Sequence, residues 1–418
     1  MRIRIDSPSA RFGIIVVGFL VVVPFSYYSA RAYRARRNAR VPDVSHLQSA
    51  VDLEPGDAES HALLGLAQLQ ALQNAALAQK SFQTATALNP HDGRYWLYLA
   101  TADSFLNDSA GQKRALERAI EVEPTSPSIS WVAANFLLTN GETERALRLL
   151  RVVLESPSSD ANQVYSISWR ASGKNTGLLL RELVPPNLDG STAFLRWLTA
   201  RGETQAAEQV WRRAQDSDQR MDSRSLPYVD LLLAGNHVVE AKEAWDAIAS
   251  GVPSMARAKQ RDNLVFNGNF DEEPLNSGFD WHIAPGAHVT VLLDTATAHV
   301  TSRSLSLNFN GSAAGDLNLY QLIAVQPNTQ YAFSAYQKTE ELSSSSEPQI
   351  RISDMASNAE LLSIKAPLGS SSWRQIQGEF RTGNETRLIK LALEQTPPRV
   401  VRGTVWLAEV VLQQRRGN

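Results

Sequence analysis

Apolar residues in the first half of the chain recur at helical spacing, and each run stops at a proline. These prolines are Pro55, Pro90, Pro124 and Pro157, which are 35, 34 and 33 residues apart. Proline lacks the amide donor that a helix interior needs and clashes with the preceding turn, so it ends a helix. The spacing predicts one helical hairpin for each interval.

The interval from residue 93 to residue 126 shows the predicted unit in full. Its first helix places apolar and small residues three or four positions apart, and its second helix does the same after a turn at residues 107–111. The residues on these two packing faces are Trp96, Leu99, Ala100, Ala115, Leu116, Ala119 and Ile120. The unit is therefore helix, turn, helix and proline.

This unit resembles the tetratricopeptide repeat (TPR), in which small residues let two helices approach and large ones fill the space between them. The matching positions are Leu64, Gly65, Ala78, Phe82, Ala85 and Pro90 in one unit, and Trp96, Leu99, Ala100, Ala119 and Pro124 in the next. We expect TPR-like repeats over residues 41–158 and degenerate hairpins of the same kind over 159–250. The resemblance implies a helical solenoid.

A solenoid presents a groove to an extended peptide or another subunit. The side chains that point away from the predicted packing positions are the candidates for contact with a protein partner: Tyr95, Tyr98, Asp103 and Asn135. The alternative for the same residues is a solvated face that binds nothing.

From residue 263 to residue 415 the helical spacing is replaced by short runs in which apolar and polar residues alternate. We predict strands at residues 288–293, 304–311, 320–325, 330–338, 349–354, 373–382, 387–395 and 404–413. Period-two alternation between Gly, Pro, Asn and Ser turns is typical of an all-β sandwich. Residues 251–262 would then be a linker between the helices and the sandwich.

The order of these strands resembles the galactose-binding-like jelly roll of carbohydrate-binding modules. The motifs that carry the resemblance are "NLVFNGNFDEEP" from Asn263, "VQPNTQYAFSAY" from Val325, and the closing "VWLAEVVL". The resemblance implies glycan binding and a structural calcium ion, for which Asp271 and Glu409 are the candidate ligands. Ala408 stands where the family often has an aspartate, and this departure weakens the case for the calcium. No other cofactor is implied.

Exposed aromatic rings are the residues that we expect to bind sugar, because a pyranose presents a patch of C–H groups that packs on a ring face. Tyr320 and Tyr336 are the ring candidates, and Asn318, Gln321 and Arg351 are the candidates for polar contacts. Both tyrosines can instead pack in the sandwich with only their hydroxyl groups in water. We expect Tyr331 and Trp373 in the core, and Trp281 in the core or at its rim.

No constellation of catalytic residues stands out. Asp271, Glu272, Glu273 and Asp280 are carboxylates of the kind that a glycosidase pairs, but the surrounding sequence is typical of a solvated turn before Pro274. The chain contains no cysteine, which excludes disulfides and thiolate chemistry. The net charge of −2 leaves no basic field for nucleic acid. The sequence therefore predicts a binding protein and no enzyme.

The N-terminal 40 residues predict contact with a membrane. Residues 12–30 carry no charge, and 19 helical residues span about 28 Å, close to the hydrocarbon thickness of a bilayer. An uncleaved anchor is favoured over a signal peptide because arginines crowd the possible cleavage site at Ala30–Ala32. The excess of arginines after the apolar run points to a cytoplasmic C-terminal side, whereas a carbohydrate-binding domain points to the outside.

Together these features predict a multidomain protein with a transmembrane helix, a TPR-like solenoid and a β-sandwich. We expect a single-pass inner-membrane protein with its main body in the periplasm, an adaptor that holds a protein on the repeats and a polysaccharide on the sandwich. Such an adaptor would serve cell-envelope or exopolysaccharide biology. The alternatives are a structural assembly factor whose sandwich binds protein, and an accessory polysaccharide-processing protein.

Overall fold

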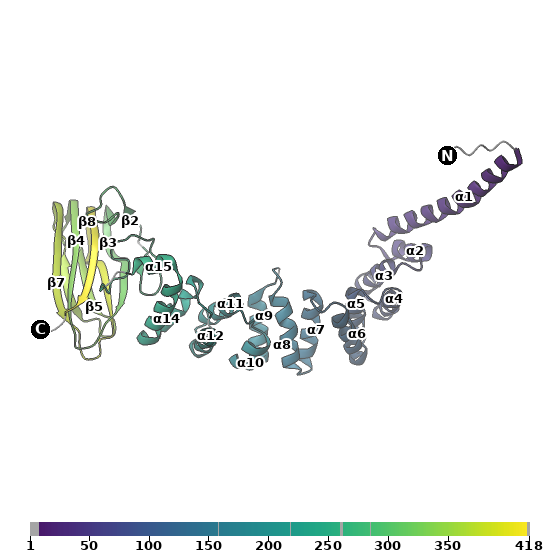
Figure 1. Cartoon of the computed structure of the whole chain (residues 1–418), viewed down its shortest axis with the longest axis horizontal. Helices are drawn as coiled ribbons and strands as arrows, with labels where there is room; N and C mark the ends of the chain where they lie inside the picture. Colours follow the sequence, from purple (N-terminus) through teal and green to yellow (C-terminus); the bar gives the residue numbers. More distant parts are fainter. Residues whose placement is uncertain (1–7, 158, 218, 260–261, 285, 416–418) are drawn as a thin grey trace. The chain divides into compact units, whose positions relative to one another are not determined.

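The computed structural model describes residues 8–157, 159–217, 219–259, 262–284 and 286–415, and it is helical in its first part and all-β in its last part (Figure 1). The chain divides into two compact units, residues 1–183 (unit 1) and residues 184–418 (unit 2). The predicted fold class, helical repeats followed by a β-sandwich, is confirmed.

Unit 1 is a series of helices that pack in antiparallel neighbours. They are α1 (Pro8–Ala39), α2 (Val44–Leu53), α3 (Ala58–Gln70), α4 (Ala75–Leu88), α5 (Gly93–Phe105), α6 (Ser109–Val122), α7 (Pro127–Thr139), α8 (Thr143–Leu154), α9 (Ala161–Ala171) and α10 (Thr176–Glu182). Pro55, Pro90, Pro124 and Pro157 follow the ends of α2, α4, α6 and α8, as the spacing predicted. Asp or Asn side chains cap the start of most of these helices, among them Asp57 and Asn74.

The close approach of α3 and α4 shows why the pattern needs small residues. Phe82 is fully buried, and a Cβ atom on Gly65 would lie 2.5 Å from its ring. Ala78 and Ala85 flank the same ring position on α4 and are also fully buried. Glycine at position 65 therefore creates the space that the phenylalanine of the next helix occupies.

Helix α1 is longer than the apolar run that predicted it. Its segment Arg11–Ala39 is long and apolar enough to cross a membrane, a property that an anchor shares with a signal sequence. Its last turns pack on α2: Ala35 is buried there, and the Arg31 guanidinium donates to the carbonyl of Leu53. The end of α1 thus supplies the packing partner that α2 needs.

Unit 2 begins with helical hairpins and a short 3-10 turn. These elements are α11 (Leu188–Thr199), α12 (Thr204–Asp216), η1 (Ser223–Ser225), α13 (Leu226–Ala234), α14 (Val238–Gly251) and α15 (Pro253–Ala258). The segment expected as a linker, residues 251–262, therefore contains a helix. Met255 and Ala258 of this helix are buried, so the segment packs against its surroundings.

The sandwich consists of antiparallel strands in which two long strands belong to both layers. The strands are β1 (Trp281–Ile283), β2 (Val289–Asp294), β3 (Ser304–Ala324), β4 (Gln330–Ser344), β5 (Gln349–Asp354), β6 (Glu360–Lys365), β7 (Gly369–Arg381) and β8 (Leu388–Gln414). The first half of β3 and the second half of β8 form one layer with β2, β4 and β7. The other halves form the second layer with β1, β5 and β6.

This arrangement corrects the expected strand count. The runs at 304–311 and 320–325 are one strand, β3, and the runs at 387–395 and 404–413 are one strand, β8. Register shifts between Asn310 and Leu319 mark the point where this ladder turns from one layer to the other. Strands β1 and β6 were not predicted, because β1 is three residues long and β6 lacks a clear alternation.

An aromatic contact joins the helices of unit 2 to the sandwich. Trp245 of α14 is buried edge-to-face against Phe266 and Phe279, with ring centroids 5.0 and 5.9 Å apart. Gly278 has a φ of +60°, and a Cβ there would lie 2.5 Å from the indole. The Asp230 carboxylate of α13 accepts hydrogen bonds of 2.7 Å from the Gly278 amide and from the hydroxyl of Ser277.

Replacement of Trp245 by Ala is expected to destabilise unit 2 by about 3–5 kcal/mol, because it leaves a cavity beside the two phenyl rings of Phe266 and Phe279. Urea unfolding of residues 184–418 measures this loss. The matched control is Trp373→Ala, which removes a half-buried indole from the sandwich surface and should cost about 1 kcal/mol or less. Equal losses in the two variants would show that Trp245 does not hold the helices on the sandwich.

Candidate functional site

A cluster of three aromatic rings lies on the outer face of the layer that contains β4 and β7. The rings of Tyr336 (β4) and His299 (loop β2–β3) stack with centroids 4.0 Å apart, and the ring of Trp373 (β7) lies 5.5 Å from that of His299. All three side chains are half-buried. We call these three residues the Trp373 cluster.

Glu409 holds the histidine of this cluster in place. Its Oε1 lies 3.0 Å from His299 Nδ1 and accepts a 3.0 Å hydrogen bond from the amide of Val300. Glu409 has a φ of +50° in a β-bulge of β8, where Ala408 and Val410 on either side of it are both buried. The bulge turns the carboxylate outward, toward the loop that carries His299.

The position of Trp373 corrects the expectation that it lies in the core. Ile376 and Phe380 of β7 point into the sandwich, and Trp373 is out of phase with them. The strand alternation itself contained this information, since Trp373, Gln375 and Gln377 share one face. Within the described residues the indole N–H of Trp373 donates no hydrogen bond, so it is available to a ligand. Tyr331 and Trp281 are in the core.

A second indole on this face is not available in the same way. Trp406 is only 6% exposed, and its Nε1 donates a 2.8 Å hydrogen bond to Asp294. The ammonium group of Lys338 lies over its ring, 4.9 Å from the centroid. The open aromatic surface of this layer is therefore the Trp373 cluster.

The other expected ring, Tyr320, projects from the opposite layer. One row of residues crosses five strands of that layer: His282, Tyr320, Ala392, Arg351 and Ser363. Tyr320 and Arg351 are two strands apart, about 10 Å, with the small Ala392 between them. The structure thus brings Tyr320 and Arg351 onto one face, and it places Tyr336 on the other side of the sandwich.

The groups around Tyr320 are engaged with other protein groups. The His282 ring stacks on Tyr320 at 4.6 Å, and the ammonium group of Lys390 also lies 4.6 Å from the Tyr320 ring centroid. Arg351 forms ion pairs with Glu360 (3.3 Å) and Glu394 (3.5 Å). Tyr320 therefore presents less free ring surface than its sequence context suggested.

Two further residues of the expected sugar site have different positions. Asn318 is exposed on the same strand face as Tyr320, with a φ of +47°. Gln321 points into the core and is fully buried, where its side-chain amide bonds both the amide and the carbonyl of Phe266. Gln321 as a sugar contact is therefore wrong: it satisfies buried backbone groups of the opening segment.

The expected calcium ligands both contact the loop between β2 and β3. Asp271 accepts a 3.0 Å hydrogen bond from the hydroxyl of Ser302, and Glu409 binds His299 and Val300 of the same loop. No group of three or more Asp, Glu or His side chains converges in the described part of the chain. Calcium takes six to eight oxygen ligands, and the sequence proposed only these two carboxylates as candidates. Calcium binding therefore stays a prediction.

The other carboxylates of the opening segment form ion pairs or are buried alone. Glu272 pairs with Arg257, and Glu273 pairs with Arg303. Asp280 is 1% exposed and accepts hydrogen bonds from the amides of Leu275 and Trp281. Burial raises the pKa of Asp280 to about 7, although these two hydrogen bonds oppose the shift. This geometry is typical of a structural carboxyl group.

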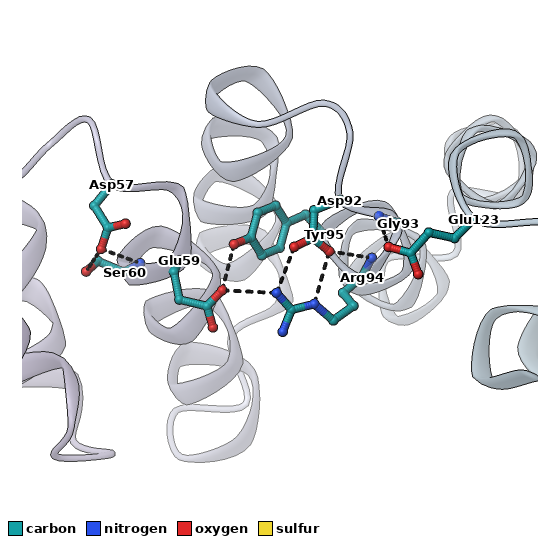
Figure 2. Close-up of polar contacts among 8 residues, drawn as sticks. All are labelled: Asp57, Glu59, Ser60, Asp92, Gly93, Arg94, Tyr95 and Glu123. Atoms are coloured by element: carbon teal, nitrogen blue, oxygen red, sulfur yellow. Dashed lines mark hydrogen bonds and ion pairs between the residues drawn. The ribbon is translucent and has the colours of Figure 1, made fainter. Parts of the chain in front are cut away.

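Of the expected protein-binding residues in the repeats, Tyr95 and Asp103 are buried, which corrects the expectation that they are free. The Tyr95 hydroxyl donates a 2.6 Å hydrogen bond to Glu59, which also pairs with Arg94 (Figure 2). Burial, together with this bond to Glu59, raises the pKa of Tyr95 well above its usual range. Asp103 accepts a 2.6 Å hydrogen bond from Gln79, and burial raises its pKa.

Tyr98 and Asn135 remain partly exposed. The Tyr98 ring packs beside Phe82, with centroids 5.6 Å apart, and the Asn135 amide donates to the carbonyl of Trp131. The start of α5 is tied to the end of α6, since Glu123 accepts a hydrogen bond of 2.9 Å from the Gly93 amide (Figure 2). Two of the four predicted contact residues, one on α5 and one on α7, are therefore still accessible.

An open cleft of about 390 Å³ lies between α14 and the sandwich of unit 2. Val238, Val239, Leu264 and Val325 form its apolar part, and Lys242 and Arg387 are among its charged residues. No exposed aromatic ring lines it, since Tyr331 is buried in the core. The cleft therefore lacks the flat ring surface that a sugar ring packs against.

Comparison with known proteins gives a family match for most of the sandwich. Residues 262–399 match the family model of a carbohydrate binding domain. The solved structures that resemble the chain include one titled "CBM4 structure and function" (12% identity, TM-score 0.29, 36% of this chain and 99% of that one). The resemblance to carbohydrate-binding modules that the sequence motifs predicted is confirmed for this part of the chain.

Two other solved structures also resemble part of the chain. A MamA protein has 13% identity and a TM-score of 0.31 over 37% of this chain and 86% of that one. YrrB, titled a TPR protein with an unusual peptide-binding site, has 16% identity and a TM-score of 0.29 over 40% of this chain and 81% of that one. A search of curated proteins gives no match.

The raised pKa of Asp280 predicts that unit 2 loses stability as the pH rises from about 4 to about 7. In this range the folded state holds a proton that the unfolded state releases, so folding becomes less favourable with rising pH. Three pKa units correspond to at most about 4 kcal/mol. The measurement is the melting temperature of residues 184–418 between pH 4.5 and pH 8.

Asp280→Asn should flatten this part of the pH profile, because the variant has no carboxyl group to ionise there. The control is Glu385→Gln, which removes an exposed carboxylate of the same sandwich. An Asp280→Asn profile parallel to that of the unmodified chain would refute the assignment.

Proposed function

We propose that this protein is a membrane-anchored, non-enzymatic adaptor whose sandwich binds a glycan and whose helical repeats bind a protein or peptide. The match of residues 262–399 to a carbohydrate binding domain supports the first activity. The stacked hairpins of unit 1 support the second, because such arrays present extended surfaces. Helix α1 supports the anchor.

The Trp373 cluster is the glycan site that the geometry favours. It presents an indole on an outer sheet face, beside the phenol of Tyr336, which stacks on the histidine that Glu409 holds. Exposed Gln375 and Gln377 lie on the same strand face and offer amides to sugar hydroxyls. Aromatic stacking combined with nearby amide groups is the chemistry that recognises a pyranose, so this cluster carries the proposal.

The repeats are proposed to bind a protein through the face of α5 and α7 that bears Tyr98 and Asn135. Tyr95 and Asp103 would support this face from within, because they are buried beneath it. The main body is proposed to lie in the periplasm, where a polysaccharide ligand of the cell envelope or an exopolysaccharide is accessible. Two alternatives have the same architecture: an assembly factor whose sandwich binds protein, and an accessory polysaccharide-processing protein.

Glycan binding is tested on residues 184–418, because a shorter fragment that begins after α15 would expose Phe266 and Phe279, which Trp245 covers. The unit is screened on an array of neutral and acidic polysaccharides, and the best ligand is titrated by calorimetry. Trp373→Ala and Tyr336→Ala should each weaken binding about tenfold or more, which is about 1.4 kcal/mol.

Tyr320→Ala is the matched control, since it removes a ring of the same kind from the opposite layer. Its affinity should stay within about twofold of that of the unmodified unit. If Tyr320→Ala abolishes binding and Trp373→Ala does not, the site is on the other layer. If no polysaccharide binds at millimolar concentration, the glycan proposal is refuted. The alternative, a sandwich that binds protein, is then favoured.

Topology is tested by protease treatment of spheroplasts that carry the full chain. If the main body is periplasmic, added protease digests the repeats while a cytoplasmic marker stays intact. Protection of the repeats until the cells are lysed would place them in the cytoplasm, as the count of arginines after the apolar segment suggests. Release of the chain in soluble form would instead show that residues 1–30 act as a signal peptide.

A further inference from the structure

The end of α1 carries a dense group of arginines just outside its apolar segment. Residues 31–40, which we call the stem, contain Arg31, Arg34, Arg36, Arg37 and Arg40. The helix continues without a break to Ala39, so most of these side chains are held along about 15 Å of one helix. The stem also packs on α2 through Ala35, which fixes its orientation relative to the first repeat.

Four of these arginines have no partner among the residues that the structure describes. Arg31 donates to the carbonyl of Leu53, whereas Arg34, Arg36, Arg37 and Arg40 are exposed and form no hydrogen bond or ion pair within the described residues. Arginines elsewhere in the chain are commonly paired. Arg94 binds Asp92 and Glu59, and Arg224 binds Asp222 and Asp189.

The acidic groups that follow the stem do not neutralise it. Asp43 caps α2 through the amides of Ser45 and His46. Hydrogen bonds from the Ser45 hydroxyl and the His46 ring, together with these amides, hold the pKa of Asp43 well below its usual range. Asp57 caps α3 in the same way. The stem therefore keeps several uncompensated positive charges.

The stem lies at the level of α1 where its charges would meet a lipid surface. Tyr27, Tyr28 and Tyr33 are each more than 60% exposed on the same part of α1, and tyrosine is the side chain expected at the level of lipid headgroups. A hollow of about 720 Å³ lies between α1 and the loop after α2. Phe25, Tyr28 and Arg31 line the side formed by α1, and Leu53 at the end of α2, with Glu54 and Asp57 of the loop, lines the other side.

We infer that the stem binds the phosphate groups of anionic phospholipids and thereby holds the first helical hairpin at the membrane surface. This inference rests on the proposed function of α1 as an anchor. Guanidinium groups suit phosphate because they offer paired donors in one plane, and clusters of four or more basic residues beside a membrane helix attract anionic lipid. Because stem and anchor are one helix, the repeats would begin at the headgroups without a flexible tether.

The test reconstitutes the full chain into vesicles of phosphatidylcholine alone and into vesicles with one third phosphatidylglycerol, and follows both by flotation. The affinity of the detergent-solubilised chain for short-chain phosphatidylglycerol is then compared with that for phosphatidylcholine of the same chain length. We expect the chain to float with both vesicles and to prefer phosphatidylglycerol at least tenfold. The variant Arg34→Gln, Arg36→Gln, Arg37→Gln, Arg40→Gln should lose this preference and still float.

The matched control removes the same charge from exposed arginines far from α1 in the sequence: Arg170→Gln, Arg196→Gln, Arg381→Gln, Arg387→Gln. This variant should keep the lipid preference. If the chain floats with both vesicles but shows no preference, or if the stem variant keeps it, the inference is overturned and the anchor stands. If the chain floats with neither vesicle, the anchor itself is wrong and the inference fails with it.

Discussion

The contact of Trp245 with Phe266 and Phe279 is the interaction on which the architecture of unit 2 depends. An indole between two phenyl rings removes three large apolar surfaces from water at one point. Gly278 lets the chain approach the indole, and Asp230 satisfies the amide that this approach buries. Without this contact the final hairpins and the sandwich would each expose an aromatic face, so they are better described as one unit than as two domains with a linker.

The two long strands of the sandwich determine which surfaces can act together. Because β3 and β8 each contribute to both layers, residues that are close in sequence can be sent to opposite faces. Tyr320 and Tyr336 are 16 residues apart and project from different layers, so they cannot hold one sugar ring between them. The bulge at Glu409 changes the phase of β8, and it is this change that brings a carboxylate to His299 beside Trp373.

The repeats show how burial changes the role of a polar residue. Tyr95 and Glu59 form a short hydrogen bond between α3 and α5, and Arg94 and Asp92 extend the contact at the same end of the helices. A buried hydroxyl needs such a partner. Polar residues that recur at helix starts can therefore stabilise the stacking of hairpins. The surface between these residues is left for contact with other molecules.

The sequence by itself determined the two architectures and their order. Prolines at a period near 34 residues and small residues beside Phe82 require stacked hairpins, and the alternation after residue 263 requires a sandwich, since both patterns follow from local backbone geometry. The sequence also showed that arginines are concentrated in the stem, directly after the apolar segment. Only the tertiary structure decided which aromatic residues form a surface, because a bulge at Glu409 and strands shared between layers are set by packing between distant segments. For the same reason Trp373 lies outside the core, Gln321 lies within it, and residues 253–258 form a helix that packs instead of a free linker.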